Sequence, residues 1–196
     1  MRRVVITGAG TINALARDVP GTLAAFREGR CGIGPLQIRD VERLSIQIGG
    51  QVQDWSSDLH FNRQQIVLYD KFTQFTLLAA REAVAQAGLN FDGHLGYEAG
   101  VVLGTAGGGV NTWDENYRSV YEEGKNRVHP FVVPKLMNNA AASHLSMEFN
   151  LRGPVFTVST ACASSNHAMG QAFQMVRSGQ CKAVLTGGSE SMLCFG

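Results

Sequence analysis

Cys162 is the residue of this sequence whose type and position best suit covalent chemistry. It lies in the stretch STACASSNHA, residues 159–168, between a β-like apolar run and a helix-like run. A side chain at a strand-to-helix turn is held at the start of the helix, where backbone N–H groups lack partners and favour an anion. Because the thiolate is the reactive form of cysteine, this position predicts a nucleophile. The alternative is a small core residue, a role that free cysteines often have.

Small residues around Cys162 predict a tight turn that exposes its sulfur. Ala161, Ala163 and Ser164 allow the backbone to fold back on itself. In that geometry the backbone N–H of Cys162 can donate to the oxyanion that develops on an acyl group bound to the sulfur. The sequence therefore predicts that one residue supplies both the nucleophile and an oxyanion donor.

The segment around Cys162 carries no charge. Residues 153–176 contain no Asp, Glu, Lys or Arg, although 17% of the chain is charged. A helix without charge on any face is typically buried on all sides, so we expect the helix predicted over 163–177 to lie inside the protein. Its apolar stripe consists of Met169, Ala172, Phe173 and Val176.

The sequence offers no clear general base for Cys162. His167 is the nearest histidine, but five residues along a helix turn its side chain by about 140° away from that of Cys162. We therefore expect a structural role for His167. The five histidines are His60, His94, His129, His144 and His167.

Strands and helices alternate along the chain, which predicts an α/β protein with a mixed sheet covered by helices. No repeat or Pro/Ser-rich linker interrupts residues 1–196. Alternating or short apolar runs predict strands over 3–8, 45–52, 100–105, 155–159 and 183–186. Apolar periodicity bounded by glycine or proline predicts helices over 23–29, 70–88, 113–123, 134–149 and 163–177.

The composition is that of a globular protein with no electrostatic preference for polyanions. The 196 residues are 44% hydrophobic, and 17 Lys and Arg against 16 Asp and Glu give a net charge of +1. We therefore expect neither nucleic acid nor a membrane as partner. The apolar run after the first two arginines is too short for a signal peptide, and no run approaches the about 18 residues of a membrane span.

Cysteine spacing argues against both a disulfide framework and a metal site. No C-x-x-C pair is present, so a reduced cytoplasm is the expected location. The four cysteines are Cys31, Cys162, Cys181 and Cys194.

Nearly the whole chain resembles the β-ketoacyl-[acyl-carrier-protein] synthases of the thiolase-like superfamily. The resemblance is carried by GPVFTVSTACASSNHA, by the preceding FVVPKLMNNAAASHLSMEFNLRGP and by the following AVLTGGSES. RRVVITGAG, YDKFTQFTLLAAREAVAQAGL and GVVLGTAGGG fall in that family's order and spacing. The amino-acid sequence of these stretches is most similar to that of elongating type II enzymes and their nodulation-type relatives. The resemblance implies the N-terminal half of the layered αβαβα ketosynthase fold.

The resemblance also implies a reaction, a decarboxylative Claisen condensation in fatty-acid or related lipid synthesis. An acyl chain would pass from acyl carrier protein to Cys162, and the enolate formed from malonyl-acyl carrier protein would then attack it. Acyl carrier protein and a second copy of the chain are the implied partners, and no cofactor or metal is implied.

Two departures from the family concern activity and substrate. The family's two decarboxylation histidines lie in its second half, and the histidines of this chain do not match their motifs. We therefore expect residues 1–196 to be an N-terminal half that is inactive alone in condensation. Gly107 stands where long-chain members carry a bulky aliphatic gate, which leaves the chain-length preference open. Phe131 and Val132 are the other acyl-pocket residues that the resemblance implies.

Four other interpretations of the sequence fit it less well. A dinucleotide loop at Gly8–Ala9–Gly10 lacks its third small residue, because Asn13 stands there. A cysteine hydrolase would need a nearby base, and a G-x-S-x-G elbow is absent. A non-catalytic partner that sets chain length would usually lack the cysteine. A purely structural fragment would expose an apolar face and associate with itself.

Overall fold

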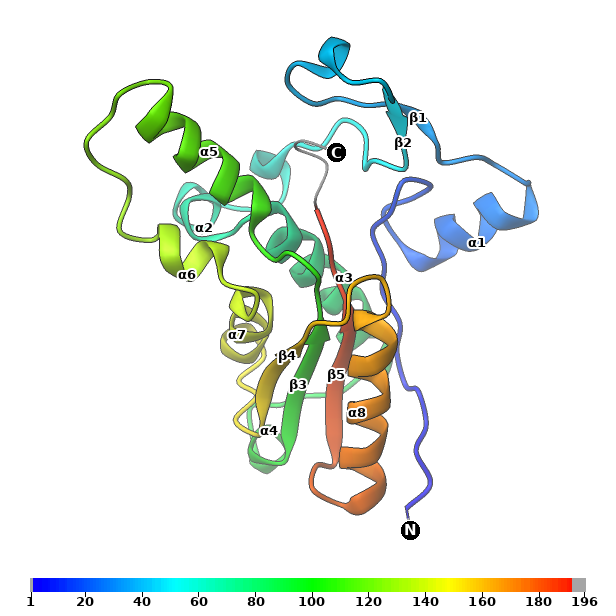
Figure 1. Ribbon diagram of the computed structural model, residues 1–196. Helices are drawn as coiled ribbons and strands as arrows, with labels where there is room; N and C mark the ends of the chain where they lie inside the picture. Colours follow the sequence, from blue (N-terminus) through cyan, green and yellow to red (C-terminus); the bar gives the residue numbers. More distant parts are fainter. Residues whose placement is uncertain (1, 192–196) are drawn as a thin grey trace.

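A three-stranded parallel sheet lies at the centre of the protein. The computed structural model describes residues 2–191, and Figure 1 shows the sheet with helices on both of its faces. The strands have the order β4-β3-β5, with both outer strands parallel to β3. They span Ala99–Gly104 (β3), Val155–Val158 (β4) and Ala183–Gly188 (β5). This arrangement confirms the predicted α/β class.

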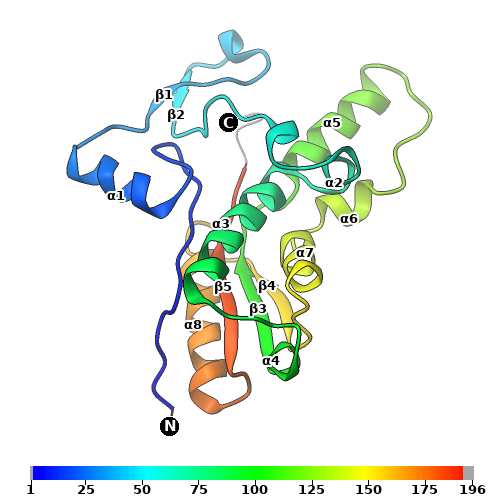
Figure 2. The ribbon, with the colours of Figure 1, turned by 180° about the vertical axis from the view of Figure 1, so that it is seen from behind.

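Helices cover both faces of the sheet because successive β3 side chains alternate between two cores. Val101 and Leu103 belong to the larger core, which contains buried residues of α3 (Lys71–Ala87) and α7 (Ala140–Glu148). Val102 points the other way, into a core shared with α8 (Ser164–Ser178). Every residue of β3 is buried, as expected for a strand with helices on both sides. Figure 2 shows α3 and α8 on opposite faces of the sheet.

Local sequence signals set the ends of the two long helices. Asp70 caps α3 by accepting a hydrogen bond from the N–H of Phe72, and Gly88 ends it with φ +62°. Gly179 ends α8 in the same left-handed conformation, with φ +87°. Glycine adopts this conformation without a steric cost, so these boundaries could be predicted.

The strand predicted over 3–8 is wrong. Residues 2–8 are extended but form no sheet ladder with the described residues, and they run beside α8 (Figure 2). Gly8 and Gly10 instead pack against the backbone of α3, where a Cβ would meet the carbonyl oxygens of Ala83 and Ala79. A strand needs backbone hydrogen bonds to a neighbour, and residues 2–8 form no ladder with any strand of the described region.

The segment before α3 is mostly irregular. The strand predicted over 45–52 is wrong except at Ile48–Gly49 (β2), which pairs antiparallel with Gly34–Pro35 (β1). Pro35 lacks a backbone N–H, which limits this ladder. The helix predicted over 23–29 begins earlier, because Asp18 caps it. The helices here are α1 (Val19–Arg27), η1 (Val41–Arg43), η2 (Ser57–Leu59) and α2 (Arg63–Leu68).

The helix predicted over 134–149 is two helices. It breaks between α6 (Val132–Leu136) and α7, where Met137 is extended with ψ 142°. The backbone at this break packs against a glycine loop, since a Cβ on Gly109 would lie 2.5 Å from the Cα of Leu136. The remaining helices are α4 (His94–Tyr97) and α5 (Val110–Tyr121), the latter three residues longer at its start than predicted.

Candidate active site

Cys162 lies in a sharp turn between the end of β4 and the start of α8. The thiol-bearing residue is exposed, and Ala161 before it has φ +50°, a left-handed conformation that is unfavourable for a residue with a Cβ. Ala163, at the N-cap of α8, has no side chain that could accept a hydrogen bond. The turn therefore presents the sulfur at a helix start that no side chain caps, as the sequence predicted.

The hydroxyl of Ser164 holds this turn in place. Its Oγ accepts a hydrogen bond from the N–H of Thr160 at 2.8 Å and donates one to the carbonyl of Ala161 at 2.7 Å. Only 4% of Ser164 is exposed, so both bonds are protected from water. One buried side chain thus connects both residues that precede Cys162.

Two glycines let the start of α8 press against the ends of the strands. A Cβ on Gly104, the last residue of β3, would lie 2.2 Å from the carbonyl carbon of Ser164. A Cβ on Gly188, the last residue of β5, would lie 2.7 Å from the Cβ of Ser165. Both distances are shorter than real Cβ contacts, so only glycine fits with this packing.

Two carboxylates, the exposed Glu190 and the buried Asp70, hold the loop that follows β3. Glu190 accepts a hydrogen bond from the N–H of Ala106 at 2.6 Å and contacts the hydroxyl of Thr105 at 3.2 Å. Asp70, which is 2% exposed, accepts from the N–H and the hydroxyl of Thr112 at 2.8 and 2.6 Å. These bonds tie the glycine loop 105–109 and the start of α5 to the rest of the fold.

The three residues predicted to line an acyl pocket come from two neighbouring segments. Gly107 is half-buried in the loop 105–109, and this loop packs against α6 through Gly109 and Leu136. Phe131 occupies the N-cap position of α6 and is 46% exposed, and Val132 is the first residue of that helix. Their pocket role stays a prediction.

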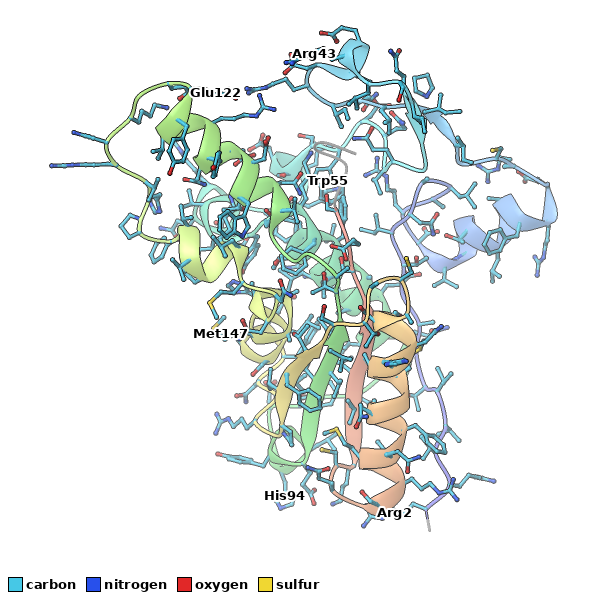
Figure 3. The ribbon with its side chains drawn as sticks, viewed as in Figure 1. Arg2, Arg43, Trp55, His94, Glu122 and Met147 are labelled. Carbon is cyan, nitrogen blue, oxygen red and sulfur yellow. The ribbon has the colours of Figure 1, made fainter. Side chains whose placement is uncertain are left out.

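The histidines are spread over the molecule. His167 is exposed on α8, and its N–H continues the helix by donating to the carbonyl of Ala163. Figure 3 shows His94 at the end of the sheet opposite to the turn at Cys162. Nδ1 of its ring lies 2.9 Å from Oε2 of Glu98. His144 packs against Tyr69 with ring centroids 4.5 Å apart, and burial lowers the pKa of its imidazole.

The expectation that α8 is buried on all sides is wrong. Ala168, Ala172 and Met175 are buried against the sheet, whereas Met169 and Phe173 are 43% and 40% exposed. The predicted stripe therefore mixes buried and exposed positions. No Asp, Glu, Lys or Arg occurs on α8 from Ser164 to Val176, and Arg177 in its last turn lies over the Phe173 ring. None of the described residues covers this outer face fully.

The other thiols differ from Cys162 in exposure or position. Cys31 is exposed and free, whereas Cys181 is buried, and this burial raises the pKa of its thiol. Cys194 lies outside the described residues.

Within residues 2–191 no group of three or more His, Cys, Asp or Glu side chains could hold a metal ion. A helix long and apolar enough to span a membrane is likewise absent from that range.

The features that sequence reasoning missed are the Ser164 hydroxyl bridge, the two strand-end glycines and the Glu190 contacts. Glycine as the last residue of an apolar strand, at Gly104 and Gly188, was the available signal, because it marks a close backbone approach. The direction of the Ser164 hydroxyl had no sequence signal.

Comparison with known proteins points to one family. Residues 1–196 match the family described as "Beta-ketoacyl synthase, N-terminal domain". The chain is 40% identical to Nodulation protein E of a Rhizobium species over 99% of this chain and 48% of that protein. It is 33% identical to 3-oxoacyl-[acyl-carrier-protein] synthase 2 of Staphylococcus aureus over 97% of this chain and 46% of that protein. The chain thus spans about half the length of these relatives.

Solved structures of ketosynthases have a fold similar to that of this chain. The ishigamide ketosynthase/chain length factor superposes with a TM-score of 0.89 at 26% identity, over 99% of this chain and 48% of that one. A type II PKS acyl-carrier protein in complex with its ketosynthase bound to the hexaketide gives a TM-score of 0.81 at 20% identity, over 97% and 51%. This second likeness concerns the fold alone. The chain belongs to the β-ketoacyl synthase family and matches its N-terminal domain.

Proposed function

We propose that this chain is the nucleophile-bearing half of a condensing enzyme that transfers acyl groups to Cys162. The observation that carries the proposal is the exposed thiol on a left-handed turn at the start of α8, with Ala161 at φ +50°. Such a turn directs the sulfur out of the sheet. Backbone N–H groups at the helix start then favour negative charge on the sulfur and on the reacting acyl oxygen.

The first half-reaction uses Cys162 as the nucleophile and as one oxyanion donor. The Cys162 thiolate attacks the carbonyl carbon of an acyl thioester, and the N–H of Cys162 donates to the resulting oxyanion. The bond between that carbon and the carrier sulfur then breaks, and the carrier leaves as a thiol after taking up a proton. The product is an acyl group in thioester linkage to Cys162.

The second half-reaction needs groups from outside residues 1–196. Condensation would require malonyl-acyl carrier protein to lose CO2 and its enolate to attack the acyl-Cys162 carbonyl. His167 is exposed on α8, and the ring of His144 packs against Tyr69. We propose that a C-terminal half supplies the decarboxylation histidines and that residues 1–196 alone do not condense.

Acyl carrier protein is the proposed partner, and the cytoplasm is the proposed location. A ketosynthase of the same fold is named in complex with its acyl-carrier protein. The free state of Cys31, Cys162 and Cys181 supports a reducing compartment.

A second copy of the chain is proposed to pair along β4. This strand forms an edge of the described sheet, Phe156 on it is 38% exposed, and a groove runs between β4 and Met137–Asn139. Native mass spectrometry of Phe156→Lys tests this. We expect the variant to be monomeric where the unaltered chain is dimeric, and an unchanged dimer would contradict the pairing.

The alternative is a non-catalytic partner that sets chain length, because one structural relative is named as a ketosynthase/chain length factor. The exposed Cys162 favours the catalytic role, since a partner that only shapes a pocket needs no thiol there.

Acyl transfer to Cys162 is the experiment that tests the proposed function. The chain is incubated with an octanoyl thioester of N-acetylcysteamine, and the adduct is mapped by mass spectrometry of peptides. We expect an octanoyl group on Cys162, none in Cys162→Ser, and an unchanged result in Cys31→Ser. An unmodified Cys162, or equal modification of Cys31, would contradict the nucleophile assignment.

A further inference from the structure

We infer that Ser164 is the positioning residue that holds Cys162 in its reactive orientation, an inference that rests on the proposed nucleophilic role of Cys162. The inference comes from four observations at the turn. They are the two hydrogen bonds of the Ser164 hydroxyl, the left-handed backbone of Ala161 and the packing of Ser164 on Gly104.

The hydroxyl of Ser164 points backward along the chain and not into its own helix. A serine that caps a helix accepts from an N–H two or three residues later. Ser164 instead accepts from the N–H of Thr160 and donates to the carbonyl of Ala161, so its bonds span the nucleophile. The hydroxyl is therefore a cross-link between the two sides of the turn, with Cys162 between them.

This cross-link opposes the strain at Ala161. A residue with a Cβ pays a steric cost at φ +50°, and such a conformation persists only where surrounding contacts hold it. The carbonyl that Ser164 binds belongs to Ala161 itself. The same carbonyl also accepts the backbone N–H of Ser164 at 3.1 Å. Loss of the hydroxyl removes one of these two bonds and the bond from Thr160, so the backbone of Ala161 could relax toward negative φ and the sulfur of Cys162 would turn away from the start of α8.

Gly104 anchors the other end of the cross-link. The backbone of Ser164 rests on Gly104 at a distance that leaves no room for a Cβ, so Ser164 cannot follow the turn if the turn moves. The Ser164 hydroxyl consequently links Ala161, the residue before Cys162, to a helix start whose position is fixed by the sheet. Ser165, the next residue, packs through its Cβ near Gly188 and makes no hydrogen bond of this kind among the described residues, which makes it the matched control.

Four variants test the inference: Ser164→Ala, Ser165→Ala, Ala161→Gly and the double variant Ser164→Ala/Ala161→Gly. The first readout is the rate of octanoyl transfer to Cys162 from the N-acetylcysteamine thioester. The second is iodoacetamide alkylation of Cys162 relative to the exposed Cys31 in the same molecule, with thermal unfolding followed for every variant.

We expect Ser164→Ala to slow acyl transfer to Cys162 at least about tenfold, as the loss of a correctly aligned reacting group does. Ser165→Ala should stay within about twofold of the unaltered chain, because it removes no contact to the turn. The double variant should recover part of the lost rate, since glycine adopts positive φ without the help of the hydroxyl. A purely structural serine would give no such rescue.

The outcomes separate the inference from the proposed function. Equal acyl-transfer and alkylation rates in Ser164→Ala and the unaltered chain, or equal slowing in Ser165→Ala, would overturn the positioning role. If the unaltered chain takes up no acyl group, the proposed function fails. Selective loss of Cys162 alkylation in Ser164→Ala would then still support the positioning role. If Ser164→Ala does not fold, the double variant is compared with Ala161→Gly. Slower acyl transfer in the double variant supports the positioning role, and equal rates overturn it.

Discussion

Gly104 and Ser164 are in backbone contact, so that the last residue of the central strand supports the helix that starts after Cys162. A Cβ on Gly104 would lie 2.2, 2.4 and 2.5 Å from three backbone atoms of Ser164 and Ser165. Backbone atoms cannot move aside as a flexible side chain can. The position of the turn at Cys162 is therefore set by the sheet through a single glycine.

Gly104→Ala should destabilise the fold and displace the start of α8. Overpacking at this contact should cost about 1–3 kcal/mol in the free energy of unfolding, measured in urea. Gly170→Ala is the matched control, because Gly170 lies in α8 with open space around its Cβ position. That change should stabilise the chain by about 0.5–1 kcal/mol through helix propensity. Equal effects of the two substitutions would contradict the close-contact argument.

Asp70→Asn should destabilise the chain by about 1.5–3 kcal/mol, because it weakens hydrogen bonds to a buried charged group. Asp70 is 2% exposed, and its Oδ2 accepts both the N–H and the hydroxyl of Thr112. An asparagine keeps only one accepting oxygen and turns an NH2 group toward one set of donors. Chemical denaturation measures the change. Asp92→Asn, at an exposed position, should change the stability by less than about 0.5 kcal/mol.

The three described thiols should differ in their reaction with iodoacetamide near neutral pH. Cys31 and Cys162 are exposed, whereas Cys181 is 1% exposed and burial raises the pKa of its thiol. We expect the two exposed thiols to be labelled in the folded chain and Cys181 only after urea is added. Rapid labelling of Cys181 without denaturant would show that the β5 side of the sheet opens in solution.

Stability should fall on mild acidification because of His144. Burial lowers the pKa of His144 from its ordinary 6.5, although Glu148 nearby acts in the opposite direction. The unfolded chain therefore binds more protons than the folded chain, so this contribution to stability is complete above pH 6.5. It decreases as the pH falls through 6.5 toward the lower folded-state value.

Urea midpoints measured between pH 7.5 and 5 test this pH dependence, with His144→Gln as the comparison. The variant should lose the part of the slope that belongs to His144. His94→Gln is the control, because the side chain of His94 is 82% exposed. Parallel pH profiles for the unaltered chain and His144→Gln would contradict the assignment.

Local patterns predicted much of the fold and the identity of the candidate nucleophile. The Asp70 and Gly88 boundaries of α3, the buried strand β3 and the turn at Cys162 all depend on residues adjacent in sequence. These signals do not depend on what lies across the molecule. Sequence reasoning was therefore reliable for α3, β3, β4, α8 and β5.

The errors have a common cause in long-range packing. Whether residues 3–8 form a strand depends on a paired neighbour, and whether α8 is buried depends on what covers its outer face. The break between α6 and α7 is set by a glycine loop distant in sequence. The Ser164 bridge depends on the direction of one hydroxyl, which composition and periodicity do not encode.

The exposed apolar side chains on the outer face of α8 also determine how the isolated chain should respond to ionic strength. Met169 and Phe173 are exposed there, and no Asp, Glu, Lys or Arg occurs from Ser164 to Val176. Contacts made through Met169 and Phe173 are apolar, so salt does not screen them, and the guanidinium of Arg177 lies over the Phe173 ring. Sulfate, which strengthens apolar burial, should therefore promote association of the chain, whereas sodium chloride should not dissociate it.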